Sequence, residues 1–168
     1  MNSVVDLRVF ANSANVPTVV LADMQQEYLA APRMLAIPDI DLALANCGRI
    51  LLHCRKVGLP VAFMRSLGES AFFNRASPFA RWIDGFEPQR NEMTFELSRP
   101  SCYSSEPFAA MLNQRPGGFV RAGFAGDTAC LRTLRGAFHR RPNIPFVHAA
   151  WAYDRRHAFD PAESPARH

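Results

Sequence analysis

Lysine is nearly absent from this chain of 168 residues: Lys56 is the only one, and the net charge of +4 comes almost entirely from arginine. The basic side chains are scattered rather than gathered into a stripe interleaved with aromatic residues, which argues against a surface for nucleic acid. No apolar run is long enough to cross a membrane, and the first residues lack the basic start and apolar core of a signal peptide. We therefore expect a cytoplasmic protein that binds neither nucleic acid nor a membrane.

The chain also lacks the spacings that mark metal and nucleotide sites. Its four cysteines, at positions 47, 54, 102 and 130, include no Cys-x-x-Cys pair, and its five histidines show no ligand spacing. No Gly-x-Gly-x-x-Gly follows the first expected strand, which argues against a nucleotide-binding Rossmann domain. Cys47 and Cys54 are seven residues apart on a helical apolar pattern, which predicts two free thiols on one buried face.

Apolar segments alternate between strand-like and helical patterns along the chain. Residues 17–23 run apolar up to Asp23, as in strands covered on both faces. A helical pattern covers about residues 40–57, with Asp39 as its expected cap and Gly58 at its end. Further strands are expected at 59–65, 93–97, 119–124 and 144–148, and further helices at about 106–113 and 128–139. This alternation predicts an α/β fold with a three-layer, Rossmann-like parallel sheet.

The length suits a single domain, taken here as residues 1–168. Residues 1–16 are interpreted as an N-terminal arm, and residues 154–168 as a loose C-terminal tail. Residues 66–92 form a long excursion between two strands, and such excursions in a compact domain are usually functional or partly structured.

Asp23 and Cys130 occupy equivalent places in this expected fold. Asp23 ends the first strand, and Cys130 lies in the first turn of the helix that follows the strand 119–124. Parallel sheets carry their chemistry at the carboxyl ends of strands, and a helix N-terminus favours a thiolate. Asp23 could then take the thiol proton while Cys130 attacks a carbonyl carbon. The structural alternative for Asp23 is a turn residue with a solvated side chain. The structural alternative for Cys130 is a small residue buried in a helix.

Three segments carry a family resemblance. Residues 20–25, Val-Leu-Ala-Asp-Met-Gln, form an apolar run that ends in Asp-x-Gln, and residues 122–134, Ala-Gly-Phe-Ala-Gly-Asp-Thr-Ala-Cys-Leu-Arg-Thr-Leu, surround Cys130. Between them stand residues 99–112, Arg-Pro-Ser-Cys-Tyr-Ser-Ser-Glu-Pro-Phe-Ala-Ala-Met-Leu. In this order they resemble the motifs of the isochorismatase-like cysteine hydrolases, the superfamily that includes nicotinamidases and N-carbamoylsarcosine amidohydrolase. The resemblance covers roughly residues 17–150.

The resemblance implies a catalytic triad of Asp, Lys and Cys. Asp23 and Cys130 match its first and last members, but no lysine stands at the middle position, where Arg99 is the nearest equivalent. Arginine can stabilise negative charge but cannot shuttle a proton, because it stays charged. Some relatives bind a divalent metal through Asp-x-His after the second strand, and residues 66–92 contain no histidine. We therefore expect neither a metal nor an organic cofactor.

The resemblance also implies a binding site for a small-molecule substrate. Backbone N–H groups at Ala129 and Cys130 are the expected oxyanion hole. The side chains expected to contact the substrate are Gln25, Phe72, Trp82 and Tyr103. The three aromatic residues could instead lie in a subunit interface, and packing in the core is the commoner role for any one of them.

The expected reaction is hydrolysis of a C–N bond in a small amide-type substrate through a covalent acyl-enzyme. The alternative is a weak or inactive relative that binds a small molecule or a protein partner, which the missing lysine favours. Relatives usually continue past the fifth strand with another strand and helix, whereas this chain ends soon after His148. The sheet then either lacks its last strand and helix or is covered by a partner subunit, and we expect a homo-oligomer.

Overall fold

The computed structural model describes residues 16–69, 72–99, 101–114, 117–124 and 146–151. The expected N-terminal arm, the helix that carries Cys130 and the expected C-terminal tail lie outside these ranges. Within the part of the chain that is described, no helix is both long and apolar enough to cross a membrane.

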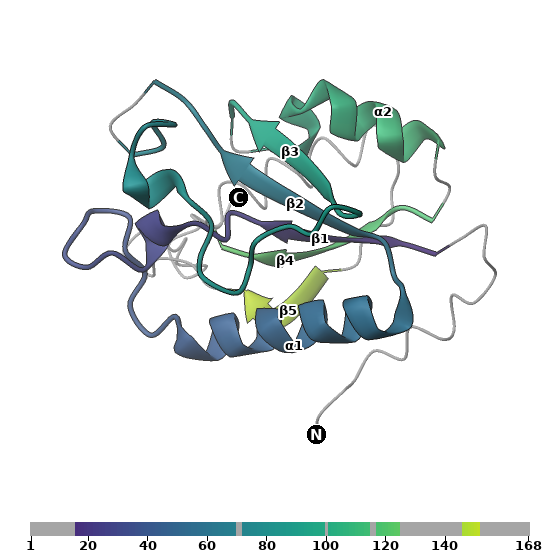
Figure 1. Ribbon diagram of the computed structural model, residues 1–168, viewed down its shortest axis with the longest axis horizontal. Coiled ribbons are helices and arrows are strands. Elements are labelled where there is room, and N and C mark those ends of the chain that lie inside the picture. Colours follow the sequence, from purple (N-terminus) through teal and green to yellow (C-terminus); the bar gives the residue numbers. More distant parts are fainter. Residues whose placement is uncertain (1–15, 70–71, 100, 115–116, 125–145, 152–168) are drawn as a thin grey trace, which may run out of the picture.

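The centre of the molecule is a parallel sheet of five strands (Figure 1). The strands lie in the order β3-β2-β1-β4-β5, and every neighbouring pair is parallel. Their bounds are Thr18–Ala22 (β1), Val61–Ser66 (β2), Met93–Leu97 (β3), Phe119–Gly123 (β4) and Phe146–Trp151 (β5). The predicted α/β fold with a parallel sheet is confirmed, although β2 begins two residues later than the sequence pattern suggested.

Two helices cover opposite faces of this sheet (Figure 1). Helix α1 (Asp41–Val57) lies along one face, and α2 (Glu106–Gln114) lies on the other. Three short 3-10 turns, η2 (Gln26–Tyr28), η3 (Pro78–Ala80) and η4 (Cys102–Ser104), sit in the connections between the larger elements. The result is the three-layer arrangement that alternating strands and helices predict.

Helix α1 presents one narrow buried face to the sheet. Ala43, Cys47, Leu51 and Cys54 are its buried residues, at the three- and four-residue spacing of a helix face. Burial of the two thiols on that face confirms the prediction for Cys47 and Cys54. Gly58 ends the helix in the left-handed conformation, with φ 72°, and its N–H donates to the Cys54 carbonyl oxygen.

The predicted cap at the start of α1 is wrong. The residue that precedes the helix is Ile40, which makes no capping hydrogen bond through its side chain. Asp39 instead adopts a left-handed conformation with φ 55°, one residue too early to be the cap. Asp tolerates this region better than most residues, so the same short polar side chain suits a turn as well as a cap.

Each face of the sheet has its own apolar core, because successive side chains of a strand point to opposite faces. Val19 and Leu21 pack on the α1 side with the buried residues of that helix. Val20 and Ala22 pack on the α2 side with Phe108.

At the carboxyl edge of the sheet, β1 and β4 come very close together. The N–H of Phe124 donates to the Ala22 carbonyl oxygen at 2.9 Å, just beyond the end of both strands. A Cβ at Gly123 would stand 2.0 Å from that same oxygen, and its φ of 123° is a conformation that other residues rarely adopt. Glycine at this position therefore allows the two strand ends to meet where the candidate site lies.

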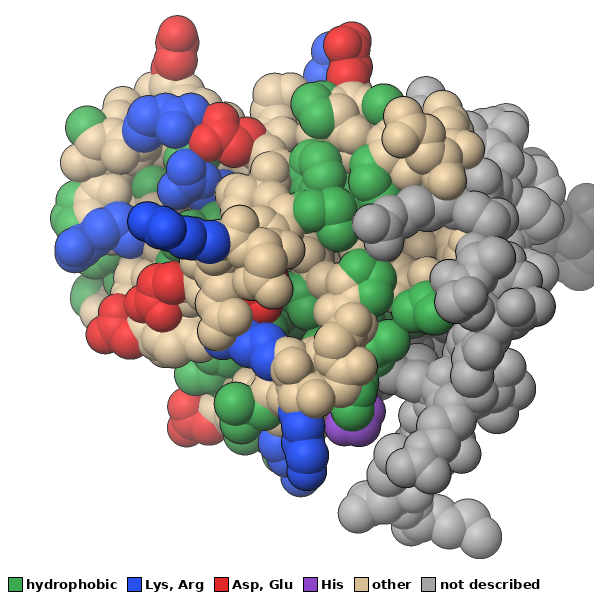
Figure 2. Space-filling view, turned by 45° about the vertical axis from the view of Figure 1, so that its right-hand side comes forward, with side chains coloured by type: hydrophobic (Ala, Val, Ile, Leu, Met, Phe, Trp, Pro, Cys, Tyr) green, Lys and Arg blue, Asp and Glu red, His purple; other side chains and the backbone are tan. Residues whose placement is uncertain are grey.

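The surface carries charges of both signs. On the face shown in Figure 2, several Lys and Arg side chains gather at the left, with Asp and Glu side chains beside them.

Candidate active site

Asp23 is the first residue after β1, in the middle of the sheet. Its side chain is 2% exposed, and its backbone has φ 59°. Its N–H donates to the Met64 carbonyl oxygen of β2 at 2.7 Å, which fixes the backbone where the strand ends. The structure therefore buries this carboxyl group at the carboxyl edge, so the alternative of a solvated turn residue is wrong.

Two side chains from the neighbouring strands hold the Asp23 carboxyl group. The Ser66 hydroxyl, at the end of β2, donates to Oδ1 at 2.7 Å. The Arg121 guanidinium, from the middle of β4, places Nη2 3.5 Å from Oδ2. Because β2 and β4 flank β1, the carboxyl group is held from both sides.

Burial raises the pKa of Asp23 above its ordinary value of 3.8. Loss of hydration is the largest cause, since it disfavours the charged form. The positive charge of Arg121 and the hydrogen bond from Ser66 act in the opposite direction. A carboxylate with a raised pKa accepts a proton more readily than an exposed one, which suits a general base.

Gln25 lies two residues beyond Asp23 and is completely buried. Its amide Nε2 donates to the carbonyl oxygens of Ser66 and Ala80, each at 3.0 Å. Its Oε1 accepts from the Ser66 N–H at 2.8 Å. Both ends of the amide are thus bonded to the protein, and Gln25 ties the loop after β1 to β2 and η3.

An aromatic cluster that the sequence analysis did not identify packs beside this loop. The ring of Tyr28 lies 5.9 Å from that of Phe73 and 6.1 Å from that of Phe124. Burial raises the pKa of Tyr28 well above 10, and the negative charge of Asp23 adds to this effect. Tyr28 is therefore a neutral hydroxyl at physiological pH and a neighbour of the Asp23 charge.

The three aromatic residues that were expected to bind substrate pack in different places. The Trp82 ring meets the Phe63 ring edge-on at 5.6 Å, within the core on the α1 side. Tyr103 packs on Phe119 at 6.2 Å, within the core on the α2 side. Phe72 is partly buried in the excursion after β2. Their roles toward a substrate stay predictions.

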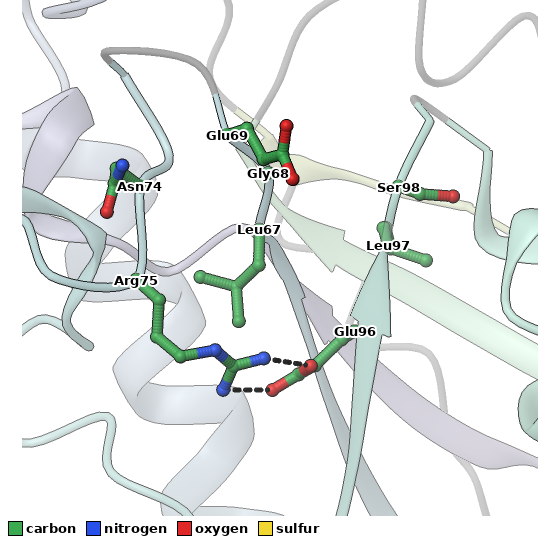
Figure 3. Close-up of a pocket in the computed structure, with 8 residues that line it drawn as sticks. All are labelled: Leu67, Gly68, Glu69, Asn74, Arg75, Glu96, Leu97 and Ser98. Atoms are coloured by element: carbon green, nitrogen blue, oxygen red, sulfur yellow. Dashed lines mark hydrogen bonds and ion pairs between the residues drawn. The ribbon is translucent and has the colours of Figure 1, made fainter.

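A hollow of about 470 Å³ opens at the carboxyl ends of β2 and β3 (Figure 3). The side chains of Arg75 and Glu96 are joined there by two hydrogen bonds, of 3.1 and 2.6 Å. The described residues that line the hollow are Leu67, Gly68, Glu69, Asn74, Arg75, Glu96, Leu97 and Ser98, and they include none of Phe72, Trp82 and Tyr103. Neither Asp23 nor Ser66 is among these lining residues, although Leu67 directly follows Ser66 in the chain.

Arg99 follows the last residue of this lining and is exposed. Its backbone carbonyl oxygen accepts hydrogen bonds from the Ser101 N–H and the Ser104 hydroxyl. Among the described residues, the ion pair of Asp23 is with Arg121 and not with Arg99. The structure therefore brings Asp23 and Ser66 together with an arginine that the sequence analysis did not select.

Cys130 and Ala129 lie outside the described residues, so their predicted roles stay predictions. The three cysteines that are described, Cys47, Cys54 and Cys102, are all buried thiols. Burial raises the pKa of Cys47 to about 12 and that of Cys54 to about 11. No group of three or more His, Cys, Asp or Glu side chains suited to a metal ion occurs among the described residues.

One signal in the sequence could have identified Arg121. It is the only charged residue in the otherwise apolar strand Phe-Val-Arg-Ala-Gly, and a charge in a buried strand requires a partner. Ser66 carries no comparable signal, because serine is a common residue in the turns and loops that follow strands.

Solved structures of known proteins share this fold. An isochorismatase from Pseudomonas putida KT2440 matches with a TM-score of 0.73 and 26% identity, over 82% of this chain and 71% of that one. A cysteine hydrolase from Pseudomonas syringae pv. phaseolicola 1448A matches with a TM-score of 0.73 and 14% identity, over 84% and 74%. An N-carbamoylsarcosine amidase from Thermoplasma acidophilum matches with a TM-score of 0.66 and 22% identity, over 86% of each chain.

The sequence comparisons agree with the structural ones at the level of the family. No curated protein matches the chain in sequence. The family model described as the isochorismatase domain matches residues 17–152, which include β1, β5 and every element between them. The chain therefore belongs to the isochorismatase family.

Proposed function

We propose that this member of the isochorismatase family hydrolyses a C–N bond in a small amide-type substrate, with Asp23 as the base and Cys130 as the nucleophile. The observation that carries the proposal is the Asp23 carboxyl group. It is buried at the carboxyl edge of a parallel sheet, its pKa is raised, and it accepts a hydrogen bond from Ser66 at the end of β2. A buried carboxylate is costly to keep, so its presence at the edge where such sheets carry their chemistry favours a catalytic role.

In the proposed reaction, the Asp23 carboxylate takes the proton of the Cys130 thiol. The thiolate sulfur attacks the carbonyl carbon, and the N–H groups of Ala129 and Cys130 hold the oxyanion. The C–N bond then breaks, and Asp23 returns the proton to the leaving nitrogen. Water attacks the thioester with Asp23 again accepting a proton, which releases the acid and restores the thiol.

The names of two structural neighbours agree with this chemistry. One is a cysteine hydrolase and another is an N-carbamoylsarcosine amidase. Both are under 25% identical to this chain, so they support the fold and offer a reaction class to test.

Iodoacetamide labelling tests the nucleophile before any substrate is known. At pH 7 we expect Cys130 to react much faster than Cys47 or Cys54, whose raised pKa values leave almost no thiolate. Cys130→Ser should remove the fast site, and Asp23→Asn should slow it. A screen of primary amides and N-carbamoyl amino acids, read by ammonia release, should then identify a substrate that both variants fail to hydrolyse.

A second outcome would favour the alternative of a binding protein. Two observations favour this alternative: the lysine of the triad is missing, and Arg99 is exposed. If Cys130 labels no faster than a model thiol and no compound in the screen is hydrolysed, the hydrolase proposal fails. Binding of the same compounds, measured by thermal shift, would then be the activity to follow.

A further inference from the structure

The middle of β4 holds a completely surrounded cation. Arg121 is 1% exposed and belongs to a strand whose every residue is buried. A buried guanidinium loses its hydration, and an apolar side chain of similar size would usually serve stability as well or better. Packing alone therefore does not explain an arginine at this place in the sheet.

Arg121 forms an ion pair with Asp23. Its Nη2 lies 3.5 Å from Oδ2, while the Ser66 hydroxyl binds Oδ1 at 2.7 Å. The two oxygens of one carboxyl group are thus held by different strands, β4 on one side of β1 and β2 on the other. This arrangement fixes both the charge and the orientation of the carboxyl group at the end of β1.

Arg99 is in a poorer position to do the same. It follows β3, which β2 separates from β1, and it is exposed. Water and salt screen the charge of an exposed guanidinium, whereas a buried one at short range acts at nearly full strength.

We propose that Arg121, and not Arg99, is the positioning cation of the active site: from inside the sheet it keeps Asp23 ionised and oriented for proton transfer. The proposal rests on the proposed role of Asp23 as base. Arg121 does not exchange a proton itself, because a guanidinium stays charged. Every proton in the reaction then passes through Asp23, and the chain needs no lysine at the middle motif.

The decisive experiment is a titration of Asp23 that does not depend on a substrate. The ¹³Cγ resonance of Asp23, assigned by its loss in Asp23→Asn, reports the pKa of the carboxyl group. Arg121→Gln should raise that pKa by at least about one unit, since an opposite charge at this distance lowers a carboxyl pKa by about 1–3 units. Arg99→Gln is the matched control and should leave the pKa unchanged.

A measurement on the unmodified protein covers the case in which Arg121→Gln does not fold. As the pH changes, the Arg121 Nε–H resonance should shift with the same midpoint as the Asp23 titration. That resonance is assigned by its loss in Arg121→Lys. If the Arg121 resonance does not follow Asp23, or if Arg99→Gln moves the Asp23 pKa and Arg121→Gln does not, the proposal is overturned.

The pH profile of Cys130 alkylation connects this titration to function. Loss of Arg121 should move the acid limb of the profile to higher pH by the same amount as the Asp23 pKa, with partial recovery in Arg121→Lys. If Cys130 is not activated in the unmodified protein, the proposed hydrolase fails, while the titration still decides whether Arg121 controls Asp23.

Discussion

Gly123 is the residue whose substitution the backbone tolerates least. It ends β4, and a Cβ there would stand 2.0 Å from the Ala22 carbonyl oxygen and 2.8 Å from the Ala22 nitrogen. These are backbone atoms of the central strand, so they cannot turn aside as the end of a flexible side chain could. The same carbonyl oxygen accepts the Phe124 hydrogen bond. A side chain at Gly123 therefore disturbs the strand that carries Asp23.

We expect Gly123→Ala to lower the free energy of unfolding by about 3 kcal/mol or more, because it combines a backbone clash with a φ of 123°. Urea unfolding followed by circular dichroism measures the change. Gly48→Ala, in α1, is the matched control: its Cβ would make an ordinary contact of 3.7 Å with Phe86, and alanine favours a helix by up to about 1 kcal/mol. Equal effects of the two substitutions would contradict the close approach of β1 and β4.

At the scale of elements, α1 offers two adjacent leucines in opposite surroundings. Leu51 is 2% exposed and belongs to the core on the α1 side, whereas Leu52 is 68% exposed. The helix turns 100° per residue, so neighbours in sequence face different directions. The same substitution at the two positions therefore separates burial from helix propensity.

We expect Leu51→Ala to lower the free energy of unfolding by about 2–5 kcal/mol, through lost burial and the cavity that remains. Leu52→Ala should change it by less than about 0.5 kcal/mol, because its side chain is already in water. Thermal and urea unfolding measure both variants. A large loss at Leu52 would mean that another segment or subunit covers this side of α1.

The elements that the sequence predicted well are those whose pattern has one physical cause. A run of apolar residues such as Val19, Val20, Leu21 and Ala22 reads as a strand because both faces are buried. The N-terminal end of α1 was misread because a short acidic side chain suits a cap and a turn equally well, and Asp39 takes the turn.

The candidate site was predictable only in part, for a similar reason. Asp23 stands out in the sequence because burying a carboxylate at the end of an apolar strand is costly unless the carboxylate is paired or functional. Its partner was sought near the missing lysine, at Arg99, whereas the structure supplies Arg121 from a strand more distant in sequence. Which cation reaches a carboxylate depends on the strand order, and periodicity along one chain does not give that order.

For the molecule as a whole, the buried and paired acids act on stability in opposite directions. The pKa of Asp23 is raised in the folded state, so its ionisation costs stability as the pH rises above 3.8. Hydrogen bonds from arginine lower the pKa of Glu92 and Glu96, so these groups add stability as the pH rises. Asp23 alone is a poor test of this balance, because removing it leaves the buried Arg121 uncompensated.

Glu92 is the clearer test, because its carboxylate joins α1 to the segment before β3. Arg55 donates to its two oxygens at 2.8 and 2.9 Å, and the Glu92 side chain is 4% exposed. The folded-state pKa lies below the ordinary value of 4.5, so the ion pair contributes fully above that pH. The contribution is lost as the pH falls through the folded-state value.

We expect Glu92→Gln to lower the free energy of unfolding at pH 7 by about 1–2 kcal/mol, a range between those of exposed ion pairs and of hydrogen bonds to charged groups. Below the folded-state pKa of Glu92 the unmodified protein and the variant should become equally stable, because the acid is then neutral in both states. Urea unfolding over a series of pH values measures the difference. Glu69→Gln is the control, since Glu69 is exposed and makes no ion pair with the described residues. If the difference in free energy of unfolding stayed constant from neutral to acidic pH, the charge of Glu92 would not be what joins α1 to the segment before β3.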